Sequence, residues 1–156
     1  MEFGRILPAE KPLVLSLLER CGLPTADVDS DLLTYFVGAR DEGKLVGVIG
    51  VQPFGHVGLL RSLAVDPTER GRGIGGRLCD EAESLAHAGD IAELYLLTNE
   101  AAEFFLKHGF EIWPRDQLPA PVQGCAQFRS LCPASATAMR KRVPSPTEGA
   151  SFKSSP

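Results

Sequence analysis

The stretch from Leu59 to Leu85 joins an apolar run, a glycine-rich turn and a helical pattern, and it constrains the fold more than any other part of the chain. The run 59–65 is too short for a typical helix and is followed by Asp66-Pro67, which predicts a buried strand. Beyond the turn at 70–76, an apolar stripe at helical spacing is formed by Ile74, Leu78, Ala82 and Leu85. Because the first N–H groups of a helix have no partners within it, a glycine turn at that point favours an anion such as a diphosphate.

Three interpretations compete for this turn. Residues 71–76 match the dinucleotide fingerprint G-x-G-x-x-G, but that motif expects an acidic residue at the end of the next strand, and Glu93 stands at its start. A solvated basic turn between two core elements is the second interpretation. In the third, residues 70–75 fit the Arg/Gln-x-x-Gly-x-Gly/Ala turn of the GNAT acetyltransferases, and the whole stretch closely resembles motif A of that family. The third interpretation accounts best for the stretch.

Alternating strand and helix patterns predict one α/β (α+β) domain over residues 1–143. The predicted strands are Phe3–Leu7, Thr34–Arg40, Leu45–Gln52, 59–65, Ala92–Thr98, Phe110–Trp113 and Ala136–Val143. The predicted helices are Ala9–Cys21, a weaker one within Thr25–Leu33, 74–85, 99–108 and Pro121–Leu131. Short turns make the second to fourth strands antiparallel, whereas the strand–helix–strand unit makes the fourth and fifth parallel.

The resemblance to GNAT acetyltransferases implies further features of this fold. It implies a mixed, mostly antiparallel sheet flanked by helices, in which the fourth and fifth strands splay apart to hold a pantetheine arm. It also implies that Thr25–Leu33 is a lid over the acceptor, although a plain connecting turn fits the sequence equally well.

Composition excludes several classes of protein. A net charge of −4 argues against nucleic acid, and no stretch has membrane-spanning length, so we expect neither partner. The N-terminus lacks the features of a signal peptide, which predicts a cytoplasmic protein. The four cysteines form no C-x-x-C pair, so we expect neither a disulfide framework nor a metal site, and Cys79 is expected to be a buried apolar residue. The Pro/Ser-rich residues 144–156 are expected to be a disordered tail.

The segment 98–110 resembles a second GNAT motif, Asn-x-x-Ala-x-x-x-Tyr-x-x-x-Gly-Phe. Asn99 is the predicted N-cap of its helix, and Glu100 suits the first turn. Counting back from Gly109, the Tyr position is Phe105 and the Asn position is Thr98. The tyrosine is the usual candidate acid for the leaving thiolate, and Phe105 cannot donate a proton. We do not take this as evidence against catalysis, because the thiolate of coenzyme A is a tolerable leaving group near neutral pH.

The resemblance implies acetyl-CoA as co-substrate. The diphosphate is expected on the N–H groups of the glycine turn, with pantetheine and the thioester along the fourth strand. The expected cofactor-binding residues are Leu63, Ala64, Val65, Arg70, Gly71, Arg72, Gly73, Ile74, Gly75, Gly76, Phe104 and Phe105. Leu63, through its main chain, and Thr98 are the expected catalytic residues, although Thr98 could instead cap the following helix.

Arg61 interrupts an apolar central strand, where an unpaired charge is costly, so it needs a carboxylate partner. That partner is either an internal carboxylate or the acceptor substrate. Weaker acceptor-side candidates are Arg115, Ser135 and Cys132, and for Cys132 a packed core thiol is favoured over an arsenic ligand. The base candidates are His56 and His108, of which His108 more readily interacts with the end of its helix.

These features predict an acetyl-CoA-dependent N-acetyltransferase that acts on a small amine, as a monomer or a homodimer. Residues 96–98, 104–105 and 109–110 resemble the acetyltransferase domain of N-acetylglutamate synthases, which suggests an amino acid acceptor. Residues 61–65, 96–98 and 131–136 resemble the acetyltransferases of arsenic-resistance operons, which suggests an arsenic-containing analogue. The alternatives are a non-catalytic acetyl-CoA sensor, a direct arsenic-binding protein and, least favoured, a nicotinamide-dependent oxidoreductase.

Overall fold

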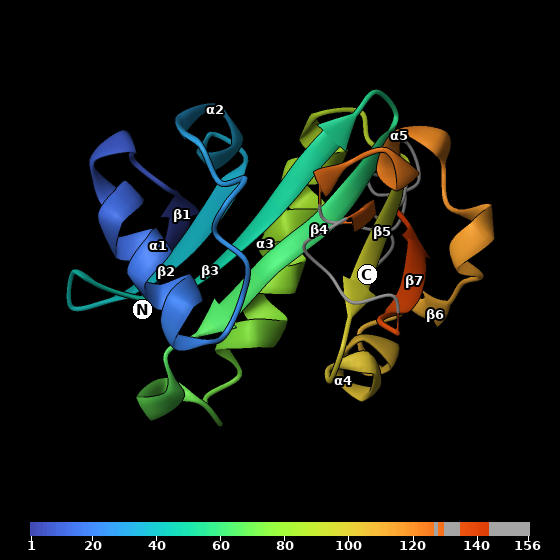
Figure 1. Cartoon of the computed structure of the whole chain (residues 1–156). Coiled ribbons are helices and arrows are strands. Elements are labelled where there is room, and N and C mark those ends of the chain that lie inside the picture. The colour runs from blue at the N-terminus through green and yellow to red at the C-terminus, as the bar shows by residue number, and fades with distance from the viewer. Residues whose placement is uncertain (127, 130–134, 144–156) are drawn as a thin grey trace, which may run out of the picture.

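A mixed sheet of seven strands, in the order β1-β2-β3-β4-β5-β7-β6, runs through the molecule (Figure 1). The strands are β1 (Glu2–Arg5), β2 (Phe36–Asp41), β3 (Lys44–Phe54), β4 (Val57–Val65), β5 (Glu93–Thr98), β6 (Glu111–Ile112) and β7 (Thr137–Arg142). The computed structural model describes residues 1–126, 128–129 and 135–143. The predicted tail at 144–156 and Cys132 lie outside these residues.

The sheet confirms the predicted topology. Strands β2, β3 and β4 pair antiparallel through tight turns, and β4 pairs parallel with β5. The last strand, β7, lies between β5 and β6, next to β6 as expected. The β4–β5 pairing covers only Val57 to Leu59 on β4 and Glu93 to Tyr95 on β5. Beyond this point the two strands diverge, which confirms the predicted splay (Figure 1).

A bulge in β4 lies where the strands diverge. Gly50 of β3 pairs with Arg61, and Val48 pairs with Ala64, so one residue of β3 faces two residues of β4. Ser62, in the bulge, has a left-handed φ of 58°. A bulge bends its strand and increases the local twist, which turns β4 away from β5. This bulge could not be predicted from the sequence, because serine is not a residue that usually adopts this conformation.

Helices cover both faces of the sheet (Figure 1). The helices are α1 (Lys11–Arg20), α2 (Ser30–Leu33), α3 (Ile74–Ala88), α4 (Ala102–Lys107) and α5 (Ala120–Gln123), with 3-10 turns η1 (Pro8–Glu10), η2 (Pro67–Glu69) and η3 (Arg115–Gln117). α1 and α2 bury Val14, Leu17 and Leu33 against one face. α3 buries its predicted stripe against the other face, together with Phe105 of α4.

Several local expectations need correction. The N-cap of α4 is Ala101 rather than Asn99, so the helix begins after Glu100 instead of including it. The expected helix at 121–131 is interrupted: α5 ends at Gln123, and Ala126, Phe128 and Arg129 are again helical, with the Arg129 N–H donating to the Cys125 carbonyl. Cys79 is buried in the α3 core as expected, and burial raises the pKa of its thiol to about 12. Among the described residues, no helix is both long and apolar enough to cross a membrane.

Candidate active site

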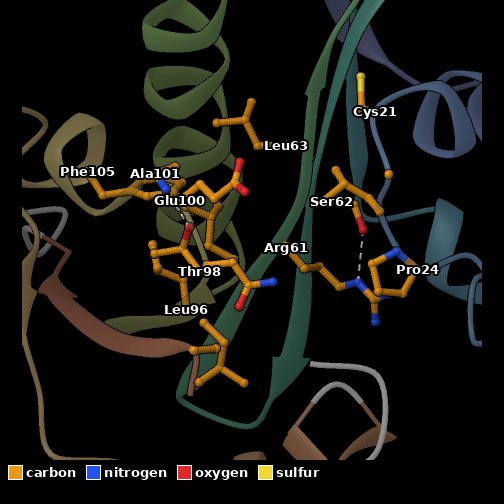
Figure 2. A pocket seen from close by; sticks show the side chains of 16 residues that line it. Cys21, Pro24, Arg61, Ser62, Leu63, Leu96, Thr98, Glu100, Ala101 and Phe105 are labelled. Atoms are coloured by element: carbon orange, nitrogen blue, oxygen red, sulfur yellow. Dashed lines mark hydrogen bonds between the residues drawn. The ribbon is translucent and has the colours of Figure 1, made fainter. Parts of the chain in front are cut away.

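Two adjoining cavities lie along the diverging part of β4. The first, about 590 Å³, is called here the Arg61 cavity, and Figure 2 shows the side chains that line it. The second, about 500 Å³, is called the glycine-turn cavity, because residues 69–76 form much of its wall. The residues that line both cavities are Cys21, Leu23, Leu63, Glu100 and Ala101. The cavities therefore meet where β4, the end of α1 and the loop before α4 approach one another.

The glycine-turn cavity is built largely from main chain. Gly71 and Gly73 have φ values of 87° and 77°, a left-handed conformation that glycine adopts without strain. Gly73 is the N-cap of α3, and the first N–H of this helix with a partner inside it is that of Arg77. The N–H groups of residues 74–76 therefore face outward at the positive end of a 15-residue helix. This arrangement fits the diphosphate of a nucleotide cofactor.

Most of the residues predicted to bind the cofactor lie in this cavity. Its lining includes Leu63, Ala64, Val65, Arg70, Gly71, Gly73, Ile74, Gly75, Gly76 and Phe104. Phe105 lines the Arg61 cavity instead. Arg72 lines neither cavity, because its guanidinium pairs with Asp41 at 3.0 Å and Glu69 at 2.5 Å on the exposed surface. The prediction that Arg72 contacts the cofactor therefore lacks geometric support.

Two glycines of α3 also allow α4 to pack closely. A Cβ at Gly76 would lie 2.8 Å from the His108 ring, and a Cβ at Gly75 would lie 3.3 Å from Phe104. Phe104 and His108 contact each other, with ring centroids 4.5 Å apart. Gly76 is thus explained by packing as well as by the expected anion site. His108 fills the space between the helices and does not line the Arg61 cavity, which argues against its role as the base.

Asp66 fixes the end of β4 next to the glycine turn. Its carboxylate accepts hydrogen bonds from the Thr68 N–H at 3.0 Å and hydroxyl at 2.8 Å, and from Arg20 of α1 at 3.0 Å. These donors, with Thr68 contributing most, lower the pKa of Asp66 to about 2 although burial opposes the shift. The carboxylate therefore ties α1 and the turn to the end of the strand.

In the Arg61 cavity, the structure answers the question of the Arg61 partner. The Arg61 side chain is 0% exposed and donates to both oxygens of Asp27, at 2.5 and 2.6 Å. It also donates to Gln52 Oε1 at 3.0 Å. Of the two partners expected, the internal carboxylate is the one present. Asp27 comes from the loop between α1 and α2, so this loop is anchored over the cavity by an ion pair.

The opposite wall of the Arg61 cavity comes from β5 and α4. Thr98 lines it, and its hydroxyl accepts a hydrogen bond at 3.0 Å from the N–H of Ala101, the N-cap residue of α4 (Figure 2). Phe105 lies in the same wall and makes edge contacts with Phe104 and Phe110. The position at which the family motif has tyrosine thus faces the cavity but offers no hydroxyl.

The remaining predicted residues lie at the margin or away from the cavity. Arg115 donates to the carbonyl of Ala136, which lines the cavity, and stacks on Phe128 rather than lining the cavity itself. Ser135 is exposed and precedes Ala136. His56 lies in the β3–β4 turn near the Asp90 carbonyl and lines neither cavity, which argues against it as the base.

Sequence reasoning missed three residues of the site. Asp27 lies in the segment Thr25–Leu33, for which the sequence predicts a weak helix, and its partner Arg61 lies 34 positions away along the chain. Ser62 forms the β4 bulge, and Glu100 lines both cavities. An unpaired arginine in a strand signalled that a carboxylate was needed, but no local pattern could identify which one.

Comparison with known proteins decides the family. The sequence profile described as "Acetyltransferase (GNAT) domain" matches residues 33–112, just over half of the chain. This chain belongs to the GNAT acetyltransferase family. The matched segment runs from the end of α2 to β6 and therefore includes β4, the glycine turn and α4.

Relatives and solved structures agree with this assignment. The chain is 33% identical over 99 residues to an amino-acid acetyltransferase of Pseudomonas syringae pv. tomato, covering 62% of this chain and 23% of that protein. It spans about a quarter of the length of the curated relatives it matches first. Its fold matches N-acetylglutamate synthase from Neisseria gonorrhoeae, complexed with coenzyme A and N-acetyl-glutamate, with a TM-score of 0.80 at 20% identity over 92% of this chain and 35% of that one.

A second solved structure has a size similar to this chain. Rv2747 from Mycobacterium tuberculosis, in complex with CoA and NLQ, matches with a TM-score of 0.78 at 22% identity. The match covers 92% of this chain and 100% of that one. The GNAT fold predicted from the sequence is therefore confirmed.

Proposed function

We propose that this GNAT domain is an acetyl-CoA-dependent N-acetyltransferase that acts on a small amine. The observation that carries the proposal is the meeting of two cavities at Leu63, one walled by the glycine turn and the other by side chains. An acyl transfer between two substrates needs both to be held in one place with their reacting atoms in contact. Neighbouring structures contain coenzyme A, which supports the assignment of the glycine-turn cavity to this co-substrate.

In this proposal the main chain performs most of the cofactor recognition. The outward N–H groups of residues 74–76 and the Arg70 side chain hold the diphosphate. The edge of β4 beyond Leu59 has no β5 partner, so its peptide groups are open to the pantetheine arm and the thioester. A main-chain N–H near Leu63 is the expected donor to the carbonyl oxygen, and loss of one such donor typically costs about 3 kcal/mol in the transition state.

We propose an amino acid or a close analogue as the acceptor. The support is that several relatives are named amino-acid acetyltransferase and that the Neisseria structure contains N-acetyl-glutamate. Among the described residues that line the Arg61 cavity, Arg61 carries the positive charge, but Asp27 already pairs with it. An acceptor carboxylate therefore gains Arg61 only by displacing Asp27, or it binds elsewhere. The arsenic-containing analogue depends on the sequence resemblance alone, because Cys132 lies outside the described residues.

A second candidate function, a non-catalytic acetyl-CoA sensor, is favoured by one observation. Phe105 faces the Arg61 cavity at the position of the motif tyrosine and cannot protonate the leaving thiolate. The sensor and the enzyme share the glycine-turn cavity, so cofactor binding alone does not distinguish them. Only the enzyme would release acetylated product.

The test is thiol release from acetyl-CoA in the presence of a pool of the common amino acids and small polyamines, with mass spectrometry of the products. The proposal expects free coenzyme A and an acetylated amine in equal amounts. Calorimetric binding of acetyl-CoA without any acetylated product would favour the sensor. Absence of both binding and turnover would overturn both functions.

A further inference from the structure

We propose that Glu100 is a catalytic residue that takes a proton from the acceptor ammonium and returns it to the leaving thiolate, an inference that rests on the proposed acetyltransferase function. Glu100 lies in the loop between β5 and α4, and it lines both cavities. Figure 2 shows its carboxylate directed toward Leu63 on the facing strand. It is therefore placed where an amine in one cavity meets a thioester in the other.

The other ionisable side chains that line the cavities are less suited to proton transfer, which supports this assignment. Of the described residues that line both cavities, only Cys21 and Glu100 have ionisable side chains. The Cys21 thiol lies 3.5 Å from the Val65 carbonyl and 3.8 Å from Arg70, so it already has two polar neighbours. Arg61 is a cation and can accept no proton.

The Glu100 carboxylate is also available for this role. No hydrogen bond or ion pair joins it to any other described residue, in contrast to Asp27 and Asp66. The other charged residues that line the two cavities are Arg61, Arg70 and Glu69, and Glu69 is paired with Arg72. Asp27 neutralises the charge of Arg61. A carboxylate without a structural partner, at the junction of two cavities, is suited to exchange protons with a bound amine.

The reaction balances with this single group. The Glu100 carboxylate removes one proton from the acceptor ammonium, and the neutral amine forms a C–N bond with the thioester carbonyl carbon. The C–S bond breaks, and its electron pair stays on sulfur. Glu100 then gives its proton to the thiolate, and the second ammonium proton leaves to water. The products are the acetylated amine, coenzyme A as a thiol and one free proton. This route needs no hydroxyl at Phe105.

The test compares Glu100→Gln, Glu100→Asp and the matched control Glu103→Gln. Glu103 is exposed in the first turn of α4 and lines neither cavity. With the amino acid and polyamine pool as acceptor, we expect Glu100→Gln to lower kcat about 100-fold without changing the calorimetric affinity for coenzyme A. Glu100→Asp, which keeps the carboxylate, should recover part of kcat. Glu103→Gln should match the wild type within about twofold.

A second readout separates proton transfer from a structural role. The deficit of Glu100→Gln should narrow at least about tenfold between about pH 7 and pH 9, because the amine then loses its proton in solution. A kcat for Glu100→Gln within about twofold of wild type, or a deficit that is independent of pH, would overturn the inference while leaving the acetyltransferase intact. If the wild type binds acetyl-CoA but acetylates nothing, the proposed function fails and the inference fails with it.

Discussion

The two cavities are built in different ways although they share Leu63. The glycine-turn cavity takes most of its wall from one continuous segment, residues 63–76, and its polar groups are largely peptide N–H groups. The Arg61 cavity is assembled from the α1–α2 region, β4, β5, the β5–α4 loop, α4 and Ala136 before β7. Its chemistry lies in side chains that are far apart in the sequence.

This difference separates what is common to the family from what is particular to the chain. A main-chain site depends on backbone conformation, so glycines and a helix N-terminus are sufficient to specify it. A side-chain site changes with each residue of its wall. We therefore expect the glycine-turn cavity to determine the co-substrate and the Arg61 cavity to determine the acceptor.

The largest effect is expected on stability, from removing the partner of Arg61. Asp27→Ala leaves a fully buried guanidinium without its carboxylate, which typically costs about 3 kcal/mol of unfolding free energy. Urea denaturation measures this loss. The double change Asp27→Leu with Arg61→Met should recover most of it, because the uncompensated charge is gone. Equal stability of Asp27→Ala and wild type would show that Arg61 does not depend on the α1–α2 loop.

A nearly equal effect is expected on cofactor binding, from the glycine turn. Gly73→Val places a branched side chain at a φ of 77° on the N-cap of α3 and should weaken coenzyme A binding about 100-fold, which is about 2.7 kcal/mol. Gly43→Val is the matched control, because its φ of 81° lies in the β2–β3 turn and away from both cavities. Both variants should be less stable than the wild type, but only Gly73→Val should show a lower calorimetric affinity for coenzyme A. A similar loss of coenzyme A affinity in the two variants would mean that general destabilisation, and not the glycine turn, causes the loss.

A smaller effect distinguishes the two arginines of the turn. Arg70 lines the glycine-turn cavity, whereas Arg72 is held by Asp41 and Glu69 outside it. Arg70→Ala should weaken coenzyme A binding about tenfold, since a point charge near a diphosphate contributes about 1 to 2 kcal/mol. Arg72→Ala should change this binding less than twofold. Titration calorimetry at one salt concentration compares them. A larger loss for Arg72→Ala would restore the role that the sequence predicted for it.

A further effect depends on pH. The pKa of Asp66 is lowered from 3.8 to about 2 in the folded chain, so its contribution to stability is fully present above pH 3.8 and is lost as the pH falls through about 2. The stability difference between wild type and Asp66→Asn should therefore be greatest at neutral pH and should narrow below about pH 4. Thermal denaturation of both proteins across this range measures it. A difference that does not change with pH would mean that the ionised carboxylate is not what stabilises this turn.

The glycine-turn cavity could be predicted from the sequence better than the Arg61 cavity could. The strand, turn and helix around Gly73 were predictable because each is specified by neighbouring residues, and the parallel β4–β5 pair followed from the strand–helix–strand order. Arg61 was recognised as a charge that needs a partner. Asp27 was not identified as that partner, because long-range pairing depends on how the loops fold back over the sheet.

Local physical causes explain other differences between sequence and structure. Arg72 remains a predicted cofactor ligand, but two nearby carboxylates hold its guanidinium at the surface. Asn99 was a good N-cap by residue type, yet α4 begins after Ala101, whose N–H donates to the Thr98 hydroxyl. The bulge at Ser62 places serine in a conformation that residue preferences disfavour, which is typical of strained positions in functional sites.

The central claim is that peptide N–H groups at the start of α3 bind the diphosphate of coenzyme A. A crystal structure of this chain with acetyl-CoA tests it most directly. The account predicts phosphate oxygens within hydrogen-bond distance of the N–H groups of residues 71–76, and the thioester beside Leu63 at the junction of the two cavities. A diphosphate bound elsewhere on the protein, or a glycine turn that keeps its N–H groups away from the ligand, would contradict the account.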